Sequence, residues 1–596
     1  MRLLFDAETD NLLPAVTRIW CIVARDLDTD EEHVFRPDQI GASLELLSEA
    51  EELSGHNIIG FDLPVLAKLR DWRPRRGVRI VDTLAWSRAS WPEIEVEDFI
   101  KGRRPPGRPH SLDAWGHRLA CPKSTHGDFS QFSEELLHRC RNDVVLNRRL
   151  YAHLLKAGVV PFGPALDLEN RFAMILARQE RHGVALDLPV LGEIHGKLVA
   201  ERDRLEPELR DLFAPWYKPE RKGGEVVVTV PKVNNKTKGV EKGCAYVKLK
   251  RIEFNPTSRD HIADRFQKKY GWRPAEFTDG GTRPKVDDEI LNALPYPEAP
   301  KLAKLMAVQK LIGTIAEGPK AWLKLERGGR IYGTIKATGA RTARCSHSNP
   351  NTANIPVRTE QGRAIRAAFI PDRGHRLTGA DAEGLEMRML GSYLALFDSS
   401  GKFIEVLLKE DIHTYMMQAT GLSDREDQKT WTYARLYGAQ PKRLASYTGR
   451  SIATERAAGA RVEAMIPGMA QMGRALDKAH RRGYVVLPDG RKAKTKSRHD
   501  TLNTLLQGSG AIVMKLALVV LDDRLQDSGW VPIEQGGDYE FVLNVHDEFQ
   551  ATSPEAVAKV IADEAPRAIR DAGLLLGLKC PLDGKAKIGD SWAQTH

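Results

Sequence analysis

Cysteine is scarce in this sequence of 596 residues, and its placement excludes two classes of protein. The six cysteines are scattered, and no two form a CxxC pair: Cys21, Cys121, Cys140, Cys244, Cys345 and Cys580. A disulfide scaffold and a zinc site built on paired cysteines are therefore not expected. Scattered single cysteines are typical of proteins that work in a reducing cytoplasm.

Long apolar runs are lacking as well. No stretch approaches the roughly 20 apolar residues that cross a bilayer, and Asp6 interrupts the apolar start of the chain. We therefore expect neither a transmembrane segment nor a secretory signal. Hydrophobic residues make up 42% and charged residues 28%, which excludes global disorder. The length predicts about four domains.

A large excess of charge is absent too, since the formal net charge is only +9. Residues 216–251 hold most of it, with ten Lys or Arg against three Glu, a local net of +7. A short basic insertion in an otherwise balanced chain favours contact with a polyanion. The alternative is a solvated lysine-rich loop.

The order of apolar patterns predicts an α/β domain over 1–155. RLLFDA, RIWCIVARDL and HNIIGF are predicted to be strands, and SEELLHRCRNDVVLNRRLYAHLL a helix. Prolines and glycines near residue 161 indicate a linker. Residues 165–213 and 298–325 are predicted to be helical, EVVVTV and CAYVKLK to form a hairpin, and the chain after 330 to mix strands and helices.

Four carboxylates of the amino-terminal region follow apolar runs or lie on the predicted helix. Asp6 and Glu8 are two residues apart, so their side chains share one side of an extended strand, whereas Asp62 and Asp143 come later. Four neighbouring carboxylates repel one another unless cations neutralise them. Oxygen ligands favour Mg²⁺ or Mn²⁺, and two such ions support phosphodiester hydrolysis.

This order of acids resembles that of the DEDD superfamily of 3′→5′ exonucleases. The resemblance implies that Asp6, Glu8, Asp62 and Asp143 are metal ligands. Family members with a polymerase usually have a tyrosine four residues before the last aspartate, where this chain has Arg139. His138 stands five residues before it, the spacing of the histidine branch, and is our candidate for activating the attacking water. The alternative is a surface His138 and an impaired exonuclease.

The carboxy-terminal half contains a second set of acids, in two separate segments. HRLTGADAEGLEMR carries Asp381, and YEFVLNVHDEF carries Asp547 and Glu548, each after a strand-like run. Two separated acids at strand ends meet the needs of two-metal phosphoryl transfer.

A predicted helix lies between these acids. Arg425, Lys429, Tyr433 and Tyr437 are spaced by four, so they share one helix face, and Gly438 follows. Such a face can present cations to a triphosphate and rings to a sugar and a base. Without the acids on either side of it in the sequence, an ordinary basic amphipathic face would be the better interpretation.

In this order, DAEGLEMR, RxxxKxxxYxxxYG and VHDE resemble the three polymerase motifs of family A DNA polymerases. TARCSHSNPNTANIP, DIHTYM and the ending DSWAQTH extend the resemblance toward the replicative polymerases of short-tailed bacteriophages. The implied fold is multidomain α/β, an RNase H-like exonuclease domain followed by a right-hand polymerase. The implied bounds are 1–155 for the exonuclease, 165–330 for the thumb with its insertion 216–251, 331–398 and 505–596 for the palm, and 399–504 for the fingers.

The resemblance also implies roles for single residues. Asp381, Asp547 and the carbonyl of Ala382 would hold two Mg²⁺ ions per site, with Mn²⁺ as a substitute, and Glu548 would support them. The triphosphate would be bound by His413, Arg425 and Lys429, of which Lys429 is also a candidate general acid for pyrophosphate.

Nucleotide selection and primer binding are implied for seven further positions. Glu386 would exclude a ribose 2′-hydroxyl, Tyr433 would set discrimination against dideoxynucleotides, and Tyr437 and Gly438 would border the templating base. Arg344, Gln507 and His546 would hold the primer end through the minor groove, where acceptors recur in every base pair. Two positions depart from the family pattern: Glu383 replaces a serine, and Ala343 replaces the glycine of T-G-R.

The implied partners are primer–template DNA and deoxynucleoside triphosphates, together with a phage helicase–primase and a single-strand binding protein. For the insertion 216–251 we favour direct DNA contact over a host thioredoxin-like processivity factor or a passive loop. The expected location is the cytoplasm of an infected bacterial host, without a membrane. Two other classes stay open: a single-subunit RNA polymerase, against which Glu386 and the exonuclease acids argue, and a non-catalytic nucleic-acid-binding protein.

Overall fold

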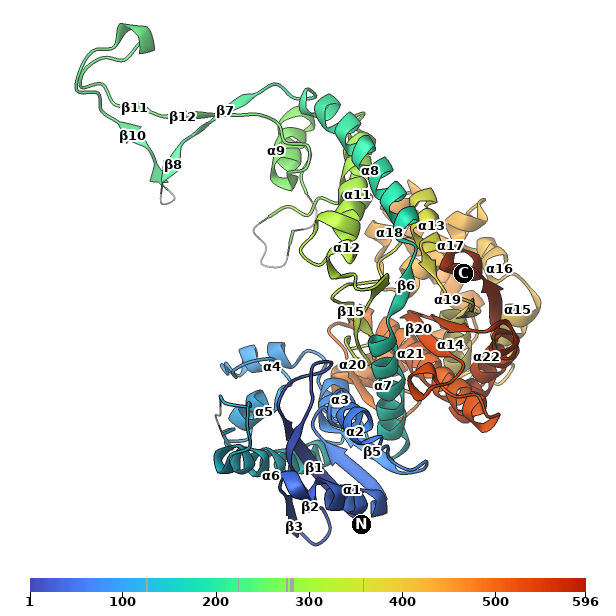
Figure 1. Cartoon of the computed structure of the whole chain (residues 1–596). Helices are drawn as coiled ribbons and strands as arrows, with labels where there is room; N and C mark the ends of the chain where they lie inside the picture. The colour runs from blue at the N-terminus through green and yellow to red at the C-terminus, as the bar shows by residue number, and fades with distance from the viewer. Residues whose placement is uncertain (125–126, 223–224, 275–276, 279–282, 357–358) are drawn as a thin grey trace. The chain divides into compact units, whose positions relative to one another are not determined.

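The structure is a computed structural model that describes residues 1–124, 127–222, 225–274, 277–278, 283–356 and 359–596. The chain divides into two compact units (Figure 1). The first unit combines Met1–Asp187 with Glu326–His596, and the second is Leu188–Leu325. The first unit therefore contains every acid that the sequence analysis selected.

A five-stranded mixed sheet forms the amino-terminal part of the first unit, in the order β3-β2-β1-β4-β5. β1 pairs antiparallel with β2 and parallel with β4, which is the arrangement of an RNase H-like domain. The strands are β1 Arg2–Thr9, β2 Ile19–Asp26, β3 Glu32–Phe35, β4 Glu52–Gly55 and β5 Arg79–Asp82. The helices are α1 Ile40–Glu49, α2 Asp62–Arg70, α3 Thr83–Ser90, α4 Ile94–Ile100, α5 Leu112–Arg118 and α6 Glu134–Ala157.

The alternation of β1 fixes which side chains meet α6. Leu3 and Phe5 belong to one apolar core, whereas Leu4 belongs to another that includes Val144 of α6. Since successive strand residues point to opposite faces, Asp6 and Glu8 share the face of Leu4. The predictions of β1, β2 and α6 are confirmed.

The prediction of a strand over HNIIGF is wrong. β4 ends at Gly55, and a turn of 56–61 leads into α2. The turn is held by Asp82, whose carboxylate accepts hydrogen bonds from the backbone N–H of Asn57 at 2.9 Å and of Ile59 at 3.1 Å. The apolar residues are buried by this turn rather than by strand pairing.

The remainder of the first unit is built around a four-stranded antiparallel sheet in the order β20-β21-β17-β22. Its strands are β17 Arg376–Ala382, β20 Glu540–Val545, β21 Glu548–Ser553 and β22 Gly584–Gly589. α22 (Glu555–Leu575) packs on this sheet and on α21 (Arg498–Asp527), and α7 (Pro164–His182) packs against β5, β20 and α21. Because of these contacts α7 belongs to the first unit, although the expected thumb of 165–330 included it.

Shorter elements complete this unit. The helices are α13 Glu360–Ala367, α14 Leu385–Leu394, α15 Lys402–Lys409, α16 Ile412–Thr420, α17 Arg425–Leu436, α18 Pro441–Thr448, α19 Ile452–Met465, α20 Met469–Arg482 and α23 Trp592–Thr595. The strands are β6 Val184–Leu186, β13 Arg330–Ile331, β14 Thr334–Lys336, β15 Ser346–Ser348, β16 Phe369–Ile370, β18 Tyr484–Val486 and β19 Lys492–Lys494.

One helix, α21, is long and apolar enough to cross a membrane. Most of its apolar window, 78%, is buried inside the protein. Burial against α22, α7, α14 and α20 accounts for its composition, so α21 is a core helix of the first unit.

The second unit consists of helices and a paired ribbon. Its helices are α8 Leu188–Arg210, α9 Arg259–Tyr270, α10 Asp288–Asn292, α11 Ala299–Ile312 and α12 Trp322–Leu325. The ribbon, drawn in green in Figure 1, contains β7 Trp216–Pro219, β8 Arg221–Lys222, β9 Glu225–Val226, β10 Val228–Thr229, β11 Tyr246–Val247 and β12 Leu249–Ile252. β10 pairs antiparallel with β11, which confirms the predicted hairpin inside the basic insertion.

Candidate functional site

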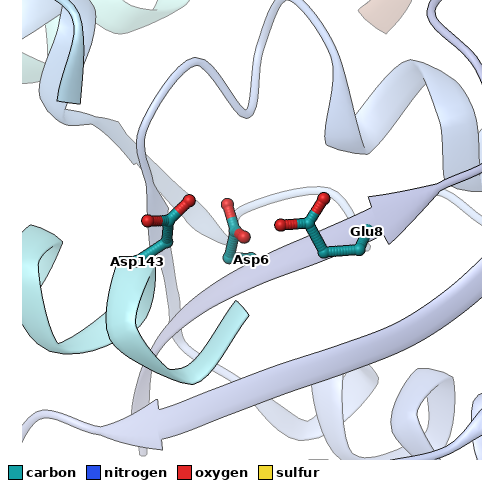
Figure 2. A group of neighbouring side chains, drawn as sticks. All are labelled: Asp6, Glu8 and Asp143. Carbon is teal, nitrogen blue, oxygen red and sulfur yellow. The ribbon is translucent and has the colours of Figure 1, made fainter. Parts of the chain in front are cut away.

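Three carboxylates from β1 and α6 point toward one another (Figure 2). Asp6 and Glu8 extend from β1, and Asp143 reaches them from α6. One oxygen of each lies within 4.8 Å of the other two. The two-residue spacing and the single face of α6 thus bring together acids that are far apart in the sequence.

Asp62 joins the same site from the start of α2. Its carboxylate is buried, and its Oδ1 accepts a hydrogen bond of 3.1 Å from the backbone N–H of Ala7. Asp6, Glu8, Asp62 and Asp143 all line one cavity of about 480 Å³. The structure therefore brings together the whole predicted amino-terminal set of acids.

The electrostatics of this cavity are those of crowded, buried acids. Burial, and then repulsion from Asp143 and Asp62, raise the pKa of Asp6 well above its usual value. Burial also raises the pKa of Asp62 to about 7 and the pKa of Asp143. Two cations reduce this cost: Lys123 Nζ lies 2.5 Å from Asp143 Oδ2, and Arg139 Nε lies 2.9 Å from Glu8 Oε1.

The donor set fits a hard divalent cation. It consists of carboxylate oxygens, and Asp143 Oδ1 is buried without a hydrogen-bond partner among the described residues. Oxygen-only ligands of this kind suit Mg²⁺ or Mn²⁺.

The structure does not bring His138 to this cavity. His138 is exposed on α6, whereas Arg139 lines the cavity, and its guanidinium carbon lies 5.1 Å from the centre of the Phe129 ring. Adjacent helix residues are turned by about 100° from each other, so only one of the two can face the acids. His56 lines the cavity instead, with Nδ1 2.9 Å from Thr83 Oγ1.

The second group of acids lies at the ends of β17 and β21. Asp381 and Glu548 are cross-strand partners, and Ala382 N donates a hydrogen bond of 3.1 Å to the backbone oxygen of Asp547. Asp547 occupies the turn between β20 and β21. Asp381, Ala382 and Asp547 line a cavity of about 1160 Å³, so antiparallel pairing brings the two predicted acids to one place.

Buried carboxylates lie close together in this cavity as well. Burial, with repulsion from Asp547 and Glu548, raises the pKa of Asp381 to about 7. Burial would raise the pKa of Glu548 as well, but hydrogen bonding lowers it below its usual value. His596 Nδ1 lies 2.6 Å from Glu548 Oε2, and Trp592 Nε1 donates to Glu548 Oε1. The oxygen donors again fit hard divalent cations.

The basic helix α17 forms the opposite side of this cavity. Lys429 and Tyr433 line it, and Tyr437 and Gly438 follow at the end of the helix. Arg425 does not line the cavity; it is about half-exposed and pairs with Asp411 at 2.5 Å. His413 is buried on α16, its ring 5.9 Å from that of Tyr433. The prediction of one shared helix face is confirmed for Lys429 and Tyr433.

Glu386 connects the two sides of the cavity. Its Oε1 accepts a hydrogen bond of 3.1 Å from Arg344 Nη2, and its Oε2 accepts one of 2.5 Å from the hydroxyl of Tyr437. His546 lines the same cavity, whereas Gln507 lies half-buried on α21 outside the residues that line it.

Neither departure from the family pattern adds a residue to the lining of this cavity, although the charge of Glu383 contributes to the raised pKa of Asp381. Glu383 pairs with Lys585 and does not line the cavity. Ala343 is buried with a φ of +54°, a left-handed conformation for which glycine is the usual residue.

Residues 230–594 of this chain match the sequence pattern described as DNA polymerase family A. The chain is a family A DNA polymerase. The polymerase is 31% identical to a DNA-directed DNA polymerase of Enterobacteria phage T3 over 712 aligned positions, which cover 100% of both chains. It is also 31% identical to the DNA-directed DNA polymerase of Escherichia phage T7, with 99% of each chain covered.

A solved structure supports the fold of the polymerase. The POL domain of Pol1 from M. smegmatis, in complex with DNA primer-template and dNTP, matches with a TM-score of 0.73. The match covers 100% of this chain and 96% of that one at 20% identity. Multidomain α/β architecture of the Pol I type is thereby confirmed for the polymerase.

Several residues of the two cavities were not selected from the sequence. Lys123 and His56 line the amino-terminal cavity, and Arg443 and Tyr447 line the larger one. They lie in loops or on helix faces without periodic or charge patterns that would single them out. The ending DSWAQTH contributes to the resemblance to phage polymerases. Its contact with Glu548 through His596 depends on the fold and does not follow from the sequence.

Proposed function

We propose that this polymerase extends the 3′ end of a primer on a DNA template by a two-metal mechanism, and that its amino-terminal acids remove misincorporated nucleotides from that end. The observation that carries the proposal is the single cavity lined by Asp381, Asp547, Lys429 and Tyr433. Such a cavity unites acids for metal ions with a cation for a triphosphate.

The acids would hold the ions, and the other residues would hold the substrates. Asp381, Asp547 and the carbonyl of Ala382 would bind two Mg²⁺ ions, or Mn²⁺ in their place, and Glu548 would support this set. When bound, such ions lower the pKa of the primer hydroxyl and neutralise charge on the phosphates. Lys429, together with Arg425 and His413, would bind the triphosphate and is a candidate proton donor for pyrophosphate.

Nucleotide and primer selection would depend on the residues near Glu386. A carboxylate beside the sugar would exclude a 2′-hydroxyl by crowding, while the ring of Tyr433 would stack against the sugar and Tyr437 and Gly438 would border the templating base. A Cβ at Gly438, whose φ is +88°, would lie 2.7 Å from the backbone oxygen of His499, so the close approach favours glycine. Arg344, Gln507 and His546 would hold the primer.

The amino-terminal site would hydrolyse the primer 3′ end. Asp6, Glu8, Asp62 and Asp143 would bind the ions there, and their raised pKa values support this, because cations would relieve the repulsion. The exposed position of His138 favours the surface-residue alternative over a base that activates water; that alternative includes an impaired exonuclease, which the primer-shortening assay below tests.

The domain bounds remain those implied by the family, with one change. We assign 1–155 to the exonuclease, 331–398 and 505–596 to the palm, and 399–504 to the fingers. For the thumb we use Leu188–Leu325, the second compact unit.

The proposed setting is phage genome replication in the cytoplasm of an infected bacterium. Primer–template DNA and deoxynucleoside triphosphates would be the substrates, and a helicase–primase and a single-strand binding protein the partners. The exposed lysines of the ribbon in 216–251 support direct contact with DNA phosphates rather than with a host thioredoxin-like factor.

Extension of a 5′-labelled primer on a longer template tests the first activity. With Mg²⁺ and the four deoxynucleotides the wild-type protein should lengthen the primer, and Asp381→Asn should not, although it still binds the duplex. Glu405→Gln is the matched control, because that exposed carboxylate pairs with Lys409 on α15 outside the cavity. Unchanged synthesis by Asp381→Asn would contradict the site assignment.

Omission of nucleotides tests the second activity. The wild-type protein should shorten the same primer with Mg²⁺ alone, and Asp6→Asn should abolish shortening while extension persists. Glu135→Gln, an exposed acid of α6, is the control. An Asp6→Asn protein that still shortens the primer would exclude the amino-terminal site as the source of the hydrolysis.

A further inference from the structure

One surface of the exonuclease domain belongs to neither cavity. It begins on α4, where Phe99 is 83% and Ile100 76% exposed. The loop that follows contains Arg103, Arg104 and Arg108, all exposed. We call Phe99, Ile100 and these three arginines the α4 surface.

The arginines of the α4 surface are uncompensated. Among the residues that the structure describes, none of the three pairs with a carboxylate, whereas the neighbouring Arg118 forms a buried pair with Asp98 at 2.5 Å. The three guanidinium groups follow the exposed ring within nine positions of the sequence and outnumber the exposed carboxylate of Glu95, so they leave a local positive charge that an anionic ligand would neutralise.

The loop is anchored at both ends. Asp98, held by Arg118, accepts a backbone hydrogen bond of 2.8 Å from Arg103 N, and the buried His110 places Nδ1 2.7 Å from Ser87 Oγ. Pro105, Pro106 and Pro109 restrict the backbone between these anchors. The three arginines are therefore presented by a constrained loop, and the ring of Phe99 by the last turn of α4.

The other side of α4 meets the polymerase portion of the same unit. Glu93 pairs with Lys496 at 2.9 Å, and Glu97 pairs with Lys494 of β19. Phe99 follows Glu97 by two positions and is turned about 200° from it around the helix. Phe99 thus points away from the contacts that α4 makes with the polymerase portion.

We propose that the α4 surface binds single-stranded DNA, with the arginines on phosphates and Phe99 stacked on an unpaired base. The proposal rests on the proposed function, which supplies the nucleic acid. Single-stranded rather than duplex DNA is favoured because an exposed ring can stack only on a base that is not already stacked in a helix. The strand is either the template ahead of the primer or a primer end that has separated from it.

Binding of a fluorescein-labelled oligothymidine of about 20 nucleotides, in EDTA, tests the charges. Arg103→Ala/Arg104→Ala/Arg108→Ala should lower the slope of log Kd against log salt by about 2, because each single-strand phosphate contact contributes about 0.7. Arg70→Ala/Arg149→Ala/Arg373→Ala is the control, since it removes three other exposed arginines. An equal slope in the wild-type and test variants overturns the proposal.

Substitution of the ring tests the stacking. Phe99→Ala should weaken binding about fivefold and Phe99→Trp should preserve it, as expected for a stacked base. A photoreactive benzophenone amino acid at position 99 should crosslink to the oligonucleotide. If Phe99→Ala binds normally and changes only the oligomeric state in sedimentation, the surface is a contact between copies and the proposal is wrong.

Two substrates distinguish the sources of the strand. Crosslinking that requires a long 5′ overhang assigns the surface to the template, and crosslinking that requires a mismatched 3′ end assigns it to the primer; either result supports the proposal. Extension on a template with a minimal overhang, measured with the same variants, should be unaffected. Failure of that extension in the wild-type protein would instead contradict the proposed function.

Discussion

The buried ion pair between Lys515 of α21 and Glu169 of α7 permits a quantitative prediction. Lys515 Nζ lies 2.8 Å from Glu169 Oε2 and 2.8 Å from Thr338 Oγ1, and Arg491 Nη1 lies 2.9 Å from the same Glu169 oxygen. The side chains of Lys515 and Glu169 are 2% and 0% exposed. Solvent therefore cannot replace a lost partner.

Lys515→Met should lower the free energy of unfolding by about 3 kcal/mol. Removal of one partner from a buried pair costs about 3–5 kcal/mol, and the lower end applies because Arg491 still compensates Glu169. Methionine keeps the packing of the lysine stem, so the loss isolates the charge. Urea denaturation at pH 7.5, followed by tryptophan fluorescence, measures the change.

A double variant tests the reasoning behind this value. Glu169→Gln/Lys515→Met removes both charges of the pair, so it should be less destabilised than the sum of the two single variants by about 1–3 kcal/mol. Lys559→Met is the control, because its pair with Glu555 is mostly exposed and should contribute less than about 0.5 kcal/mol. Additive single changes, or a neutral Lys515→Met, would refute the argument.

Three further predictions concern the polymerase region. Glu386→Ala should lower discrimination against ribonucleotides by about tenfold in primer extension, the equivalent of ~1.4 kcal/mol; undiminished discrimination would exclude crowding by this carboxylate. Since the folded pKa of Asp381 is raised, its contribution to stability is present below pH 4 and is lost as pH rises through about 7. Metal-free wild-type protein should thus lose more thermal stability between pH 5 and 8 than Asp381→Asn, and equal losses would contradict this. Ala343→Gly should change the free energy of unfolding by less than about 1 kcal/mol in urea titrations, because relief of the left-handed strain offsets the added freedom of the unfolded chain; a larger loss would show that the methyl group packs productively.

Predictions from the sequence succeeded where periodicity decides the geometry. The spacing of Asp6 and Glu8 placed both on one face of β1, and the four-residue spacing of Lys429 and Tyr433 placed both on one side of α17. These two shared faces do not depend on the rest of the fold, because they follow from the residue repeats of the strand and the helix.

Predictions failed where tertiary contacts decide the structure. HNIIGF has the composition of a strand, but hydrogen bonds that its backbone N–H groups donate to the carboxylate of Asp82 fold it into a turn. His138 and Arg139 are equally polar neighbours, and only the pitch of α6 and the position of Glu8 select Arg139. No local pattern in the sequence contains that information, since Glu8 lies more than a hundred residues away.

The shared hydrogen bonding of Glu386 makes two recognition events depend on each other. One carboxylate accepts from Arg344, which we assign to the primer, and from Tyr437, which we assign to the templating position. If these assignments hold, a primer end that draws Arg344 away would leave Glu386 with a single donor and would shift Tyr437. Coupling of this kind is reciprocal, so we expect a distorted primer terminus to weaken selection of the next nucleotide and a misplaced template base to weaken primer binding.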